Sequence, residues 1–371
     1  IRIELYGPFS PLLAHLAISA ACTILSPAAI QQYGLEIGTH PVGTGPFKFK
    51  EWVRGDHITL VAFDDYWGGR PYLDEVIIKF IPDNMVRATA LMRGEIDLMT
   101  DFSVPAYQVL SADPNIKITL APPLNISFLV MNTKKKPFDD ILVRLAVQHA
   151  INKPELVSSL YGELGEIFNG PVPSPEWAFH PDLKPYTYDP ELSRALLAAA
   201  GYPNGFSTEL WIYSAPRGYN PVGVELAEAV QGYLADVGIQ AEVVVRDYTS
   251  HTAMIKQYMH DMAFYGWYGD DLDPDEFIYV FCHSSEELGS MNLAQYKNPA
   301  VDDLLDRARV LTDQQARREL YLRAQEIVVA EAAWVWLNGI KQPYAVRSRV
   351  KNFVPNPVPW CLYFAEVWVQ D

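Results

Sequence analysis

One stretch limits the possible folds more than any other: an apolar run that breaks into a cluster of carboxylates. Residues 262–267 (MAFYGW) are apolar and aromatic and predict a buried strand. Between Gly269 and residue 276 the chain then carries four aspartates and one glutamate, and Pro274 is placed to open a helix at its first turn. A strand that ends in glycine and carboxylates is typical of the ligand-binding edge of an α/β sheet. A structural alternative has about equal weight, in which Asp273 only caps the helix.

Length and charge narrow the class of protein. The chain has 371 residues, enough for about two or three domains. Its net charge is −16, and no run of Lys or Arg is longer than the three residues 134–136. Phosphate backbones are bound by clustered cations, so we expect no nucleic-acid partner. The 21 tyrosines and nine tryptophans suggest aromatic-lined binding surfaces.

The three cysteines do not indicate a cofactor. Cys22, Cys282 and Cys361 are widely spaced and form no C-x-x-C pair, so neither a zinc site nor a redox pair is predicted. The sequence does not decide whether any two of them form a disulfide.

Other motifs of metal binding and catalysis are also incomplete. The acidic stretch resembles the start of a calcium loop, but Glu276 stands where that loop requires glycine. H-E-x-x-H and G-x-S-x-G are both absent from the sequence. We therefore expect no metal, no cofactor and no catalytic residues.

Residues 12–26 form the longest apolar run. Its Ser-Ala-Ala-Cys ending at Cys22 resembles a lipoprotein signal, but Ser19 stands where a branched apolar residue belongs. The run is too short for a membrane span. We expect a buried helix from Leu12 to Ser26, with no lipid on Cys22.

The remaining chain alternates strands and helices. Residues 47–53 and 58–63 alternate around Arg54-Gly55-Asp56, which predicts a hairpin, and Asp83 is placed to cap a helix that Gly94 ends. Near Asn132 the composition shifts towards helices. This alternation of strands and helices, with the shift near Asn132, predicts an α/β fold with two lobes.

Arg217 is the second candidate site residue. It lies in the loop SAPRGYNP (residues 214–221), after a predicted strand and before a predicted helix. A guanidinium held over a strand end can bind a carboxylate through two hydrogen bonds. The alternative, a surface or ion-paired arginine, has similar weight.

Several motifs together resemble one family, the extracytoplasmic solute-binding proteins of the dipeptide/oligopeptide/nickel class, which deliver ligands to ABC importers. The resemblance covers nearly the whole chain and is closest to the dipeptide-binding branch. It rests on PVGTGPFKFKEW (41–52), DDYWGGRPYLDEV (64–76), ALMRGEIDLM (90–99), NTKKKPFDDILVRLAVQHAINK (132–153), YDPELSRALLAAAGYPNGF (188–206) and GWYGDDLDP (266–274).

The resemblance implies a ligand site. In the dipeptide branch, the aspartate at the position of Asp270 pairs with the ligand's α-amino group, and the arginine at the position of Arg217 binds its carboxylate. The ligand would run along the backbone of Gly266, Trp267 and Tyr268 as an added strand, with Trp267 as a wall.

The chain departs from the family in two ways. Members carry a further N-terminal segment that completes the first lobe, and this chain begins after the position of that segment. Dipeptide binders also often have a disulfide across the region of Cys282, and here the next cysteine is Cys361.

We therefore expect a two-lobed α/β periplasmic-binding-protein fold, type II-like, with mixed sheets. Lobe I would comprise residues 1–126 and 338–371 and lack its N-terminal segment, and lobe II would comprise residues 133–333. Residues 127–132 and 334–337 would be two extended hinge crossovers.

The expected function is capture of dipeptides or short peptides outside the cytoplasm, by a periplasmic or lipid-anchored monomer that serves an ABC importer permease. One alternative is another amine-bearing or cationic solute, such as an opine, a metal chelate or an oligosaccharide. A less favoured one is an enzyme that uses the carboxylates of residues 270–276.

Overall fold

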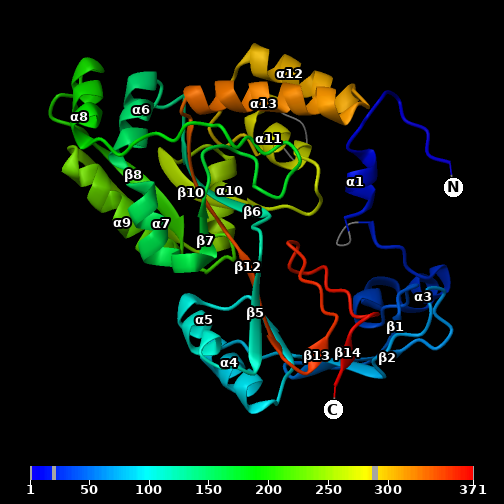
Figure 1. Cartoon of the computed structure of the whole chain (residues 1–371). Coiled ribbons are helices and arrows are strands. Elements are labelled where there is room, and N and C mark those ends of the chain that lie inside the picture. Colours follow the sequence, from blue (N-terminus) through cyan, green and yellow to red (C-terminus); the bar gives the residue numbers. More distant parts are fainter. Residues whose placement is uncertain (1, 19–21, 286–290, 371) are drawn as a thin grey trace. The chain divides into compact units, whose positions relative to one another are not determined.

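The computed structural model describes residues 2–18, 22–285 and 291–370 (Figure 1). The chain forms two compact units. Unit 1 comprises Ile1–Ala17 and Pro122–Lys341, and unit 2 comprises Ile18–Ala121 and Gln342–Asp371.

Unit 1 is built on a mixed six-stranded sheet. The strands lie in the order β7-β11-β6-β10-β8-β9, and β6 and β10 are antiparallel, whereas β8 is parallel to both β10 and β9. Their bounds are β6 Asn125–Met131, β7 Gly165–Ile167, β8 Phe206–Tyr213, β9 Ile239–Arg246, β10 Met262–Tyr268 and β11 Trp334–Ile340. Every residue of β6 and β11 is buried, because helices cover both faces of the sheet.

Six helices of unit 1 begin at side chains that accept the first free N–H groups. Asp140, Asn152, Asp189, Asp247, Asn298 and Asp313 cap α6, α7, α8, α10, α12 and α13 in this way. The helices are α1 Leu12–Leu16, α6 Ile141–Ala150, α7 Lys153–Tyr161, α8 Pro190–Ala199, α9 Gly223–Asp236, α10 Tyr248–Lys256, α11 Asp275–Cys282, α12 Pro299–Val310 and α13 Gln314–Ala330.

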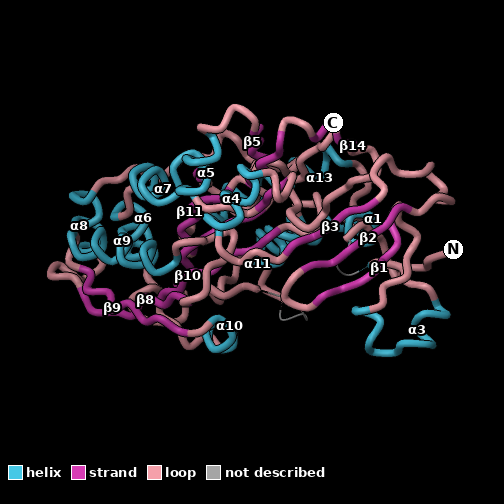
Figure 2. The backbone as a smooth tube through the Cα atoms, turned by 90° about the horizontal axis from the view of Figure 1, so that it is seen from below, coloured by secondary structure: helices cyan, strands magenta, loops and turns pink. Residues whose placement is uncertain are grey.

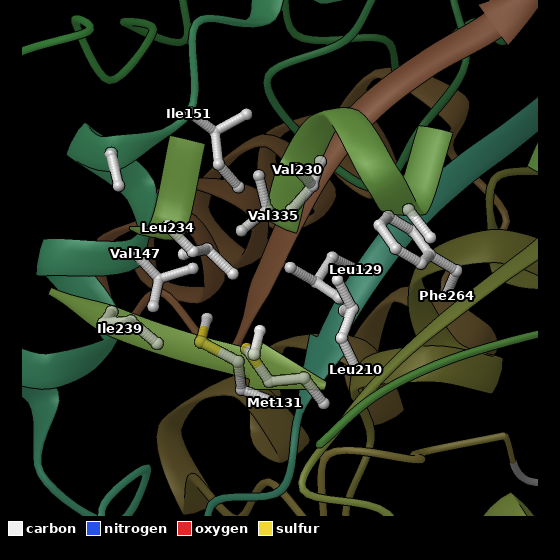
Figure 3. Packing of buried hydrophobic residues seen from close by; sticks show 14 of the residues in the cluster. Leu129, Met131, Val147, Ile151, Leu210, Val230, Leu234, Ile239, Phe264 and Val335 are labelled. Atoms are coloured by element: carbon white, nitrogen blue, oxygen red, sulfur yellow. The ribbon is translucent and has the colours of Figure 1, made fainter. Parts of the chain in front are cut away.

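The main core of unit 1 lies between the sheet and helices α6 and α9. Leu129, Leu210, Phe264 and Val335 point from four neighbouring strands towards Val147, Val230 and Leu234 of those helices (Figure 3). The opposite face of the sheet presents Phe128 to Phe281 of α11, with ring centroids 5.2 Å apart. These two packed layers fix β10 in the interior of the unit.

Unit 2 contains two three-stranded sheets and a two-stranded ribbon. The strands β1 Phe47–Val53, β2 His57–Ala62 and β3 Glu75–Lys79 lie side by side and antiparallel (Figure 2), and β4, β12 and β5 form the second sheet. The other elements are β4 Leu98–Thr100, β5 Ile116–Ala121, β12 Gln342–Arg347, β13 Val350–Lys351, β14 Trp368–Val369, α3 Pro27–Tyr33, η1 Gly34–Thr39, α4 Asn84–Arg93 and α5 Val104–Ser111.

The predicted hairpin and capped helix of unit 2 are both present. β1 and β2 flank Gly55, whose φ of 80° lies in the left-handed region that favours glycine. Asp83 caps α4 through hydrogen bonds from Met85 and Val86, and Gly94 ends it in a left-handed conformation.

The sheet β1-β2-β3 has little cover on either face. Ile77 and Ile78 of β3 are 52% and 42% exposed, and adjacent strand residues point to opposite faces. Both faces of the edge strand β3 are therefore exposed, whereas Thr59 of the central strand β2 is buried.

The predicted buried helix over residues 12–26 is wrong for the described residues. Helix α1 ends at Leu16 and contains no buried residue, Leu13 is 78% exposed, and the backbone of residues 23–26 is not helical. Residues 19–21, including Ser19, lie outside the described residues. The run is apolar without a helical period, so no single face could be buried.

The chain passes between the two units at residues 17–18, 121–122 and 341–342. The segments expected as crossovers are extended, since they lie in β6 and β11, but both strands belong to the sheet of unit 1. The first passage, near Ala17, was not expected from the sequence. It arises because residues 9–15 contact Arg309, Leu311 and Asp271.

Candidate ligand-binding site

Along its carboxyl end, β10 pairs with β6 but not with β8. All seven residues of β10 are in register with β6, but only Met262 and Ala263 are in register with β8. The Phe264 carbonyl accepts a hydrogen bond from Nε2 of His251 at 3.0 Å, on the side away from β6, whereas the Gly269 N–H donates to Leu124 on the β6 side at 2.8 Å. Because these directions alternate along an antiparallel strand, Gly266 and Tyr268 direct their backbone groups to the edge away from β6.

Gly266 is required by the packing on this strand. A Cβ there would overlap the Ile126 carbonyl oxygen and the ring of Tyr219. The ring of Tyr219 also meets Tyr268 edge to face, with centroids 5.5 Å apart. The loop that carries Tyr219 therefore lies directly against the end of β10.

The hydroxyl of Tyr268 lies where a Cβ on Gly218 would be, so Tyr268 also contacts the loop that carries Tyr219. A side chain at position 218 is excluded on steric grounds. Of the predicted site residues, Gly266, Tyr268 and the loop of Arg217 are thus brought together by direct contact.

Arg217 is held by its backbone and by an aromatic face. It exchanges two backbone hydrogen bonds with Asn220, at 3.1 Å and 2.8 Å, and its guanidinium carbon lies 3.4 Å from the ring centroid of Tyr248. Within the described residues no carboxylate lies within ion-pair distance of this guanidinium, and the buried Nε atom has no hydrogen-bond partner. Its charge is available to an anionic group.

Two of the acids after β10 are bound by arginines from distant helices. Asp273 forms two hydrogen bonds of 2.8 Å with Arg317 of α13, and Asp275 forms two of 2.8 Å with Arg309 of α12. The N–H of Asp275 also donates to Asp273 at 3.1 Å, although the cap position of α11 is Pro274. The expected capping role of Asp273 is therefore secondary to its ion pair.

Glu276 and Asp271 also bind groups within unit 1. Glu276 accepts hydrogen bonds from the indole of Trp267 at 3.1 Å and from the N–H groups of Asp270 and Asp271 at 2.8 Å and 3.2 Å. One oxygen of Asp271 accepts from the N–H of Asp273 at 2.8 Å, and the other lies 3.7 Å from Nε2 of His15.

Asp270 is the exception in this stretch. It is half-buried, and within the described residues its carboxylate accepts no hydrogen bond and forms no ion pair. Burial raises the pKa of the Asp270 carboxyl above its usual range. A cationic group bound here would restore the charge balance.

Trp267 lies three residues before Asp270, and two contacts hold its side chain in place. Its Nε1 donates to Glu276, and its ring meets Phe281 edge to face, with centroids 6.0 Å apart. The half-buried indole can form a rigid wall.

Glu176 is a further buried acid, close enough to Asp271 and Glu276 to feel their charges. Glu176 is 3% exposed, and neither of its carboxylate oxygens has a partner within the described residues. Burial, together with the charges of Asp271 and Glu276, raises the pKa of Glu176 well above its usual range, and burial raises the pKa of Glu276 to about 8.

Within the described residues no group of three or more His, Cys, Asp or Glu side chains has the geometry to hold a metal ion. Within the same residues, no helix is long and apolar enough to span a bilayer.

Sequence reasoning missed three residues of the site. Tyr248 lies under Arg217, Tyr219 fills the space above Gly266, and Glu276 binds Trp267 and Asp270. Glu276 lies within the stretch that the sequence singles out, but no local pattern distinguishes it from the neighbouring acids. Tyr248 belongs to a separate helix, so only the tertiary fold brings it to Arg217.

Comparison with known proteins identifies a family. Residues 1–288 match the model of "Bacterial extracellular solute-binding proteins, family 5 Middle". The chain is 33% identical over 328 residues to the heme-binding protein A of Haemophilus influenzae, which covers 88% of this chain and 60% of that protein. It is also 33% identical over 364 residues to the dipeptide-binding protein of Escherichia coli K12, covering 96% of this chain and 68% of that protein. The chain thus spans 60–68% of the length of these two relatives.

The fold is shared with a solved structure. The ABC transporter-associated periplasmic binding protein DppA from Helicobacter pylori, in complex with the peptide STSA, matches with a TM-score of 0.82 and 34% identity. The match covers 99% of this chain and 72% of that one. The predicted α/β periplasmic-binding-protein fold with mixed sheets is confirmed.

Proposed function

We propose, from the premise that the chain belongs to the bacterial extracellular solute-binding proteins of family 5, that it binds dipeptides or short peptides for import. Asp270 would pair with the ligand's ammonium group and Arg217 with its carboxylate. No bond would be made or broken, because the two side chains act as fixed counter-charges.

One observation carries this proposal: Asp270 and Arg217 carry opposite charges, and within the described residues neither side chain forms an ion pair. Asp273 and Asp275, only a few residues from Asp270, each bind an arginine through two hydrogen bonds. A charge enclosed in a water-poor site without a partner costs several kcal/mol. A zwitterion satisfies both residues at once.

The edge of β10 that faces away from β6 supports an extended ligand. The backbone groups of Gly266 and Tyr268 point away from β6, in the region where β8 no longer pairs with β10. A peptide could add to this edge as a short strand, with Trp267 as a side wall. The names of two similar proteins, the dipeptide-binding protein of E. coli and the peptide-bound H. pylori protein, favour the same ligand class.

Further parts of the proposal concern the whole protein. We place it outside the cytoplasm, as a monomer that delivers ligand to the permease of an ABC importer, in keeping with the family description. A further segment would cover the open sheet β1-β2-β3, whose Ile77 and Ile78 are exposed on opposite faces.

Calorimetry with end-modified ligands tests the proposal. A dipeptide, its N-acetyl form and its C-terminal amide are titrated into the full protein, supplemented with any segment that completes unit 2. Each modification should cost about 2–5 kcal/mol, because it leaves one side-chain charge without a partner. Asp270→Asn should abolish the penalty for N-acetylation only.

Asp303→Asn is the matched control, because Asp303 is an exposed acid that pairs with Arg307 on α12. It should leave all three affinities unchanged. If the three ligands bind within a few-fold of one another, Asp270 and Arg217 are ordinary structural charges and the peptide assignment fails. A solute with an amine but no carboxylate would be indicated if only the N-acetyl form loses affinity.

A further inference from the structure

We propose that Glu276 is a positioning residue for the amine-binding end of this site: it holds the backbone of Asp270 and the indole of Trp267 in the orientation that receives the ligand. The inference rests on the proposed function and deepens it, because it names the residue through which Asp270 would acquire its selectivity for a free amino group.

The contacts of Glu276 converge on the site. Its Oε2 accepts the N–H of Asp270 at 2.8 Å and the N–H of Asp271 at 3.2 Å. Its Oε1 accepts the indole Nε1 of Trp267 at 3.1 Å and also lies 3.0 Å from the N–H of Asp270. One carboxylate therefore binds both the strand end and the loop that follows it.

These hydrogen bonds define the shape of the loop between β10 and α11. Its first residue, Gly269, is fixed to Leu124 by a backbone hydrogen bond of 2.8 Å. Its last residues are fixed by the ion pairs of Asp273 and Asp275. Between these anchors, the backbone of Asp270 is held by Glu276.

Helix stability alone does not account for this arrangement. The first turn of α11 already carries Asp275, which Arg309 neutralises. Glu276 is 9% exposed, and no Lys, Arg or His of the described residues forms an ion pair with it. Burial of a carboxylate without a cation is unfavourable, so an apolar residue here would serve the core better. The donors that it accepts belong to the two proposed ligand contacts.

The consequence for binding is specific to one end of the ligand. If Glu276 is removed, the Asp270 backbone and the Trp267 ring lose their common acceptor, and the Asp270 carboxylate is no longer held in one place. The carboxylate end should not change, because Arg217 is held by Tyr248 and Asn220. We therefore expect the variant to lose discrimination between free and modified ligands at the amino end only.

The test compares Glu276→Met, which has similar volume and no acceptor oxygen, with Glu276→Gln, which retains one. Arg309→Lys is the matched control, because it weakens the hydrogen bonds to the same turn of α11 without contacting Trp267 or Asp270. Each full-length variant is titrated with a dipeptide, its N-acetyl form and its C-terminal amide. Thermal unfolding of each variant is measured alongside.

For Glu276→Met we expect the Kd of the free dipeptide to rise about tenfold, because one or two hydrogen bonds to the Glu276 side chain are lost. The Kd of the N-acetyl form should change little, so the ratio between the two forms shrinks. The ratio between amide and free acid should stay as in the wild type. Glu276→Gln should give an intermediate ratio, and Arg309→Lys the wild-type ratio even if the protein is less stable.

If the wild type discriminates against N-acetylation and Glu276→Met and Glu276→Gln do so equally well, the inference is overturned and the proposed function stands. If Glu276→Met does not fold, the result with Glu276→Gln decides alone, and an unchanged ratio overturns the inference. A wild type that ignores N-acetylation refutes the proposed function, and the inference with it.

Discussion

At the scale of single residues, two buried histidines beside β10 should make the protein sensitive to acid. His251 and His260 are both fully buried, and Nε2 of His251 donates to the Phe264 carbonyl. Burial lowers the pKa of each imidazole to about 4, and for His260 the charge of Lys135 adds to the effect.

The lowered pKa values determine how the folding stability changes with pH. In the folded state the histidines bind fewer protons than in the unfolded state, whose pKa is about 6.5. Their contribution to stability is therefore complete above pH 6.5 and is lost as the pH falls from 6.5 to 4. Urea unfolding at pH 7.0 and 4.5 should show a loss of about 2 kcal/mol for each histidine at the acid end.

The variant His260→Leu should reduce that acid loss, and His40→Gln in unit 2 should not, because His40 is exposed and stacks on Tyr33. An equal acid sensitivity in the wild type and in His260→Leu would contradict the assignment.

The sequence alone selects the acidic stretch but not the role of each acid within it. Asp270, Asp273 and Glu276 have the same local surroundings in sequence. What separates them is whether an arginine about 40 residues away reaches them, as Arg317 reaches Asp273. The family resemblance supplies Asp270 and Arg217 as ligand contacts, and their binding of ligand stays a prediction.

At the scale of elements, the ion pair between Asp273 and Arg317 should be a main attachment of α11 to α13. Both side chains are buried, at 4% and 6% exposure, and the pair is joined by two hydrogen bonds of 2.8 Å. Removing one partner leaves a buried charge alone, which costs about 3–5 kcal/mol. We expect Arg317→Met to lose that amount in chemical denaturation.

The double variant Asp273→Asn with Arg317→Met should lose less than the sum of the two single variants, because neither charge is then left alone. On α12 the exposed pair of Asp303 and Arg307 serves as the control and should contribute less than about 1 kcal/mol. Additive losses in the buried pair would show that the two charges act independently.

Elements with a local signal were predicted correctly, and those without one were not. Helix α4 was located by its cap Asp83 and its stop Gly94. The run from Leu12 to Ser26 is apolar throughout, and hydrophobicity without a period does not specify which face is buried. The open edge of β10 also has no local signal, because it depends on where β8 diverges from it.

At the scale of the whole molecule, residues 122–341 should fold when produced alone. The large hydrophobic core of unit 1 lies entirely within them. The two ends are held together by Asn125, whose side chain accepts from the N–H of Ile340 at 2.8 Å and donates to its carbonyl at 2.7 Å. The fragment should unfold cooperatively in urea, and its stability should be lower than that of the full chain by at least the contribution of residues 9–15.

Asn125→Ala should destabilise the fragment by about 1–3 kcal/mol, since it leaves two backbone groups of Ile340 unsatisfied. The exposed Asn115 in unit 2 offers a control in the full chain. A fragment that binds a hydrophobic dye and melts without a sharp transition would refute its independence.

Two lobes could be inferred from the sequence, but their boundaries could not be located. The sequence predicts the links at the apolar segments near Asn125 and Trp334, because each is short and flanked by polar or Gly/Pro residues. Both are instead central strands of one sheet. A buried strand and a buried link have the same composition, so only the pairing partners distinguish them.

The pairing of Ala121 with Gln342 has a consequence for how such a protein can arise and be rebuilt. These two residues face each other in register at the ends of β5 and β12, and everything from 122 to 341 emerges between them. To unit 2, that whole domain occupies the place of a hairpin turn, which elsewhere takes about two to five residues. A gene could therefore acquire, lose or exchange the domain at one site without altering the pairing of β5 with β12.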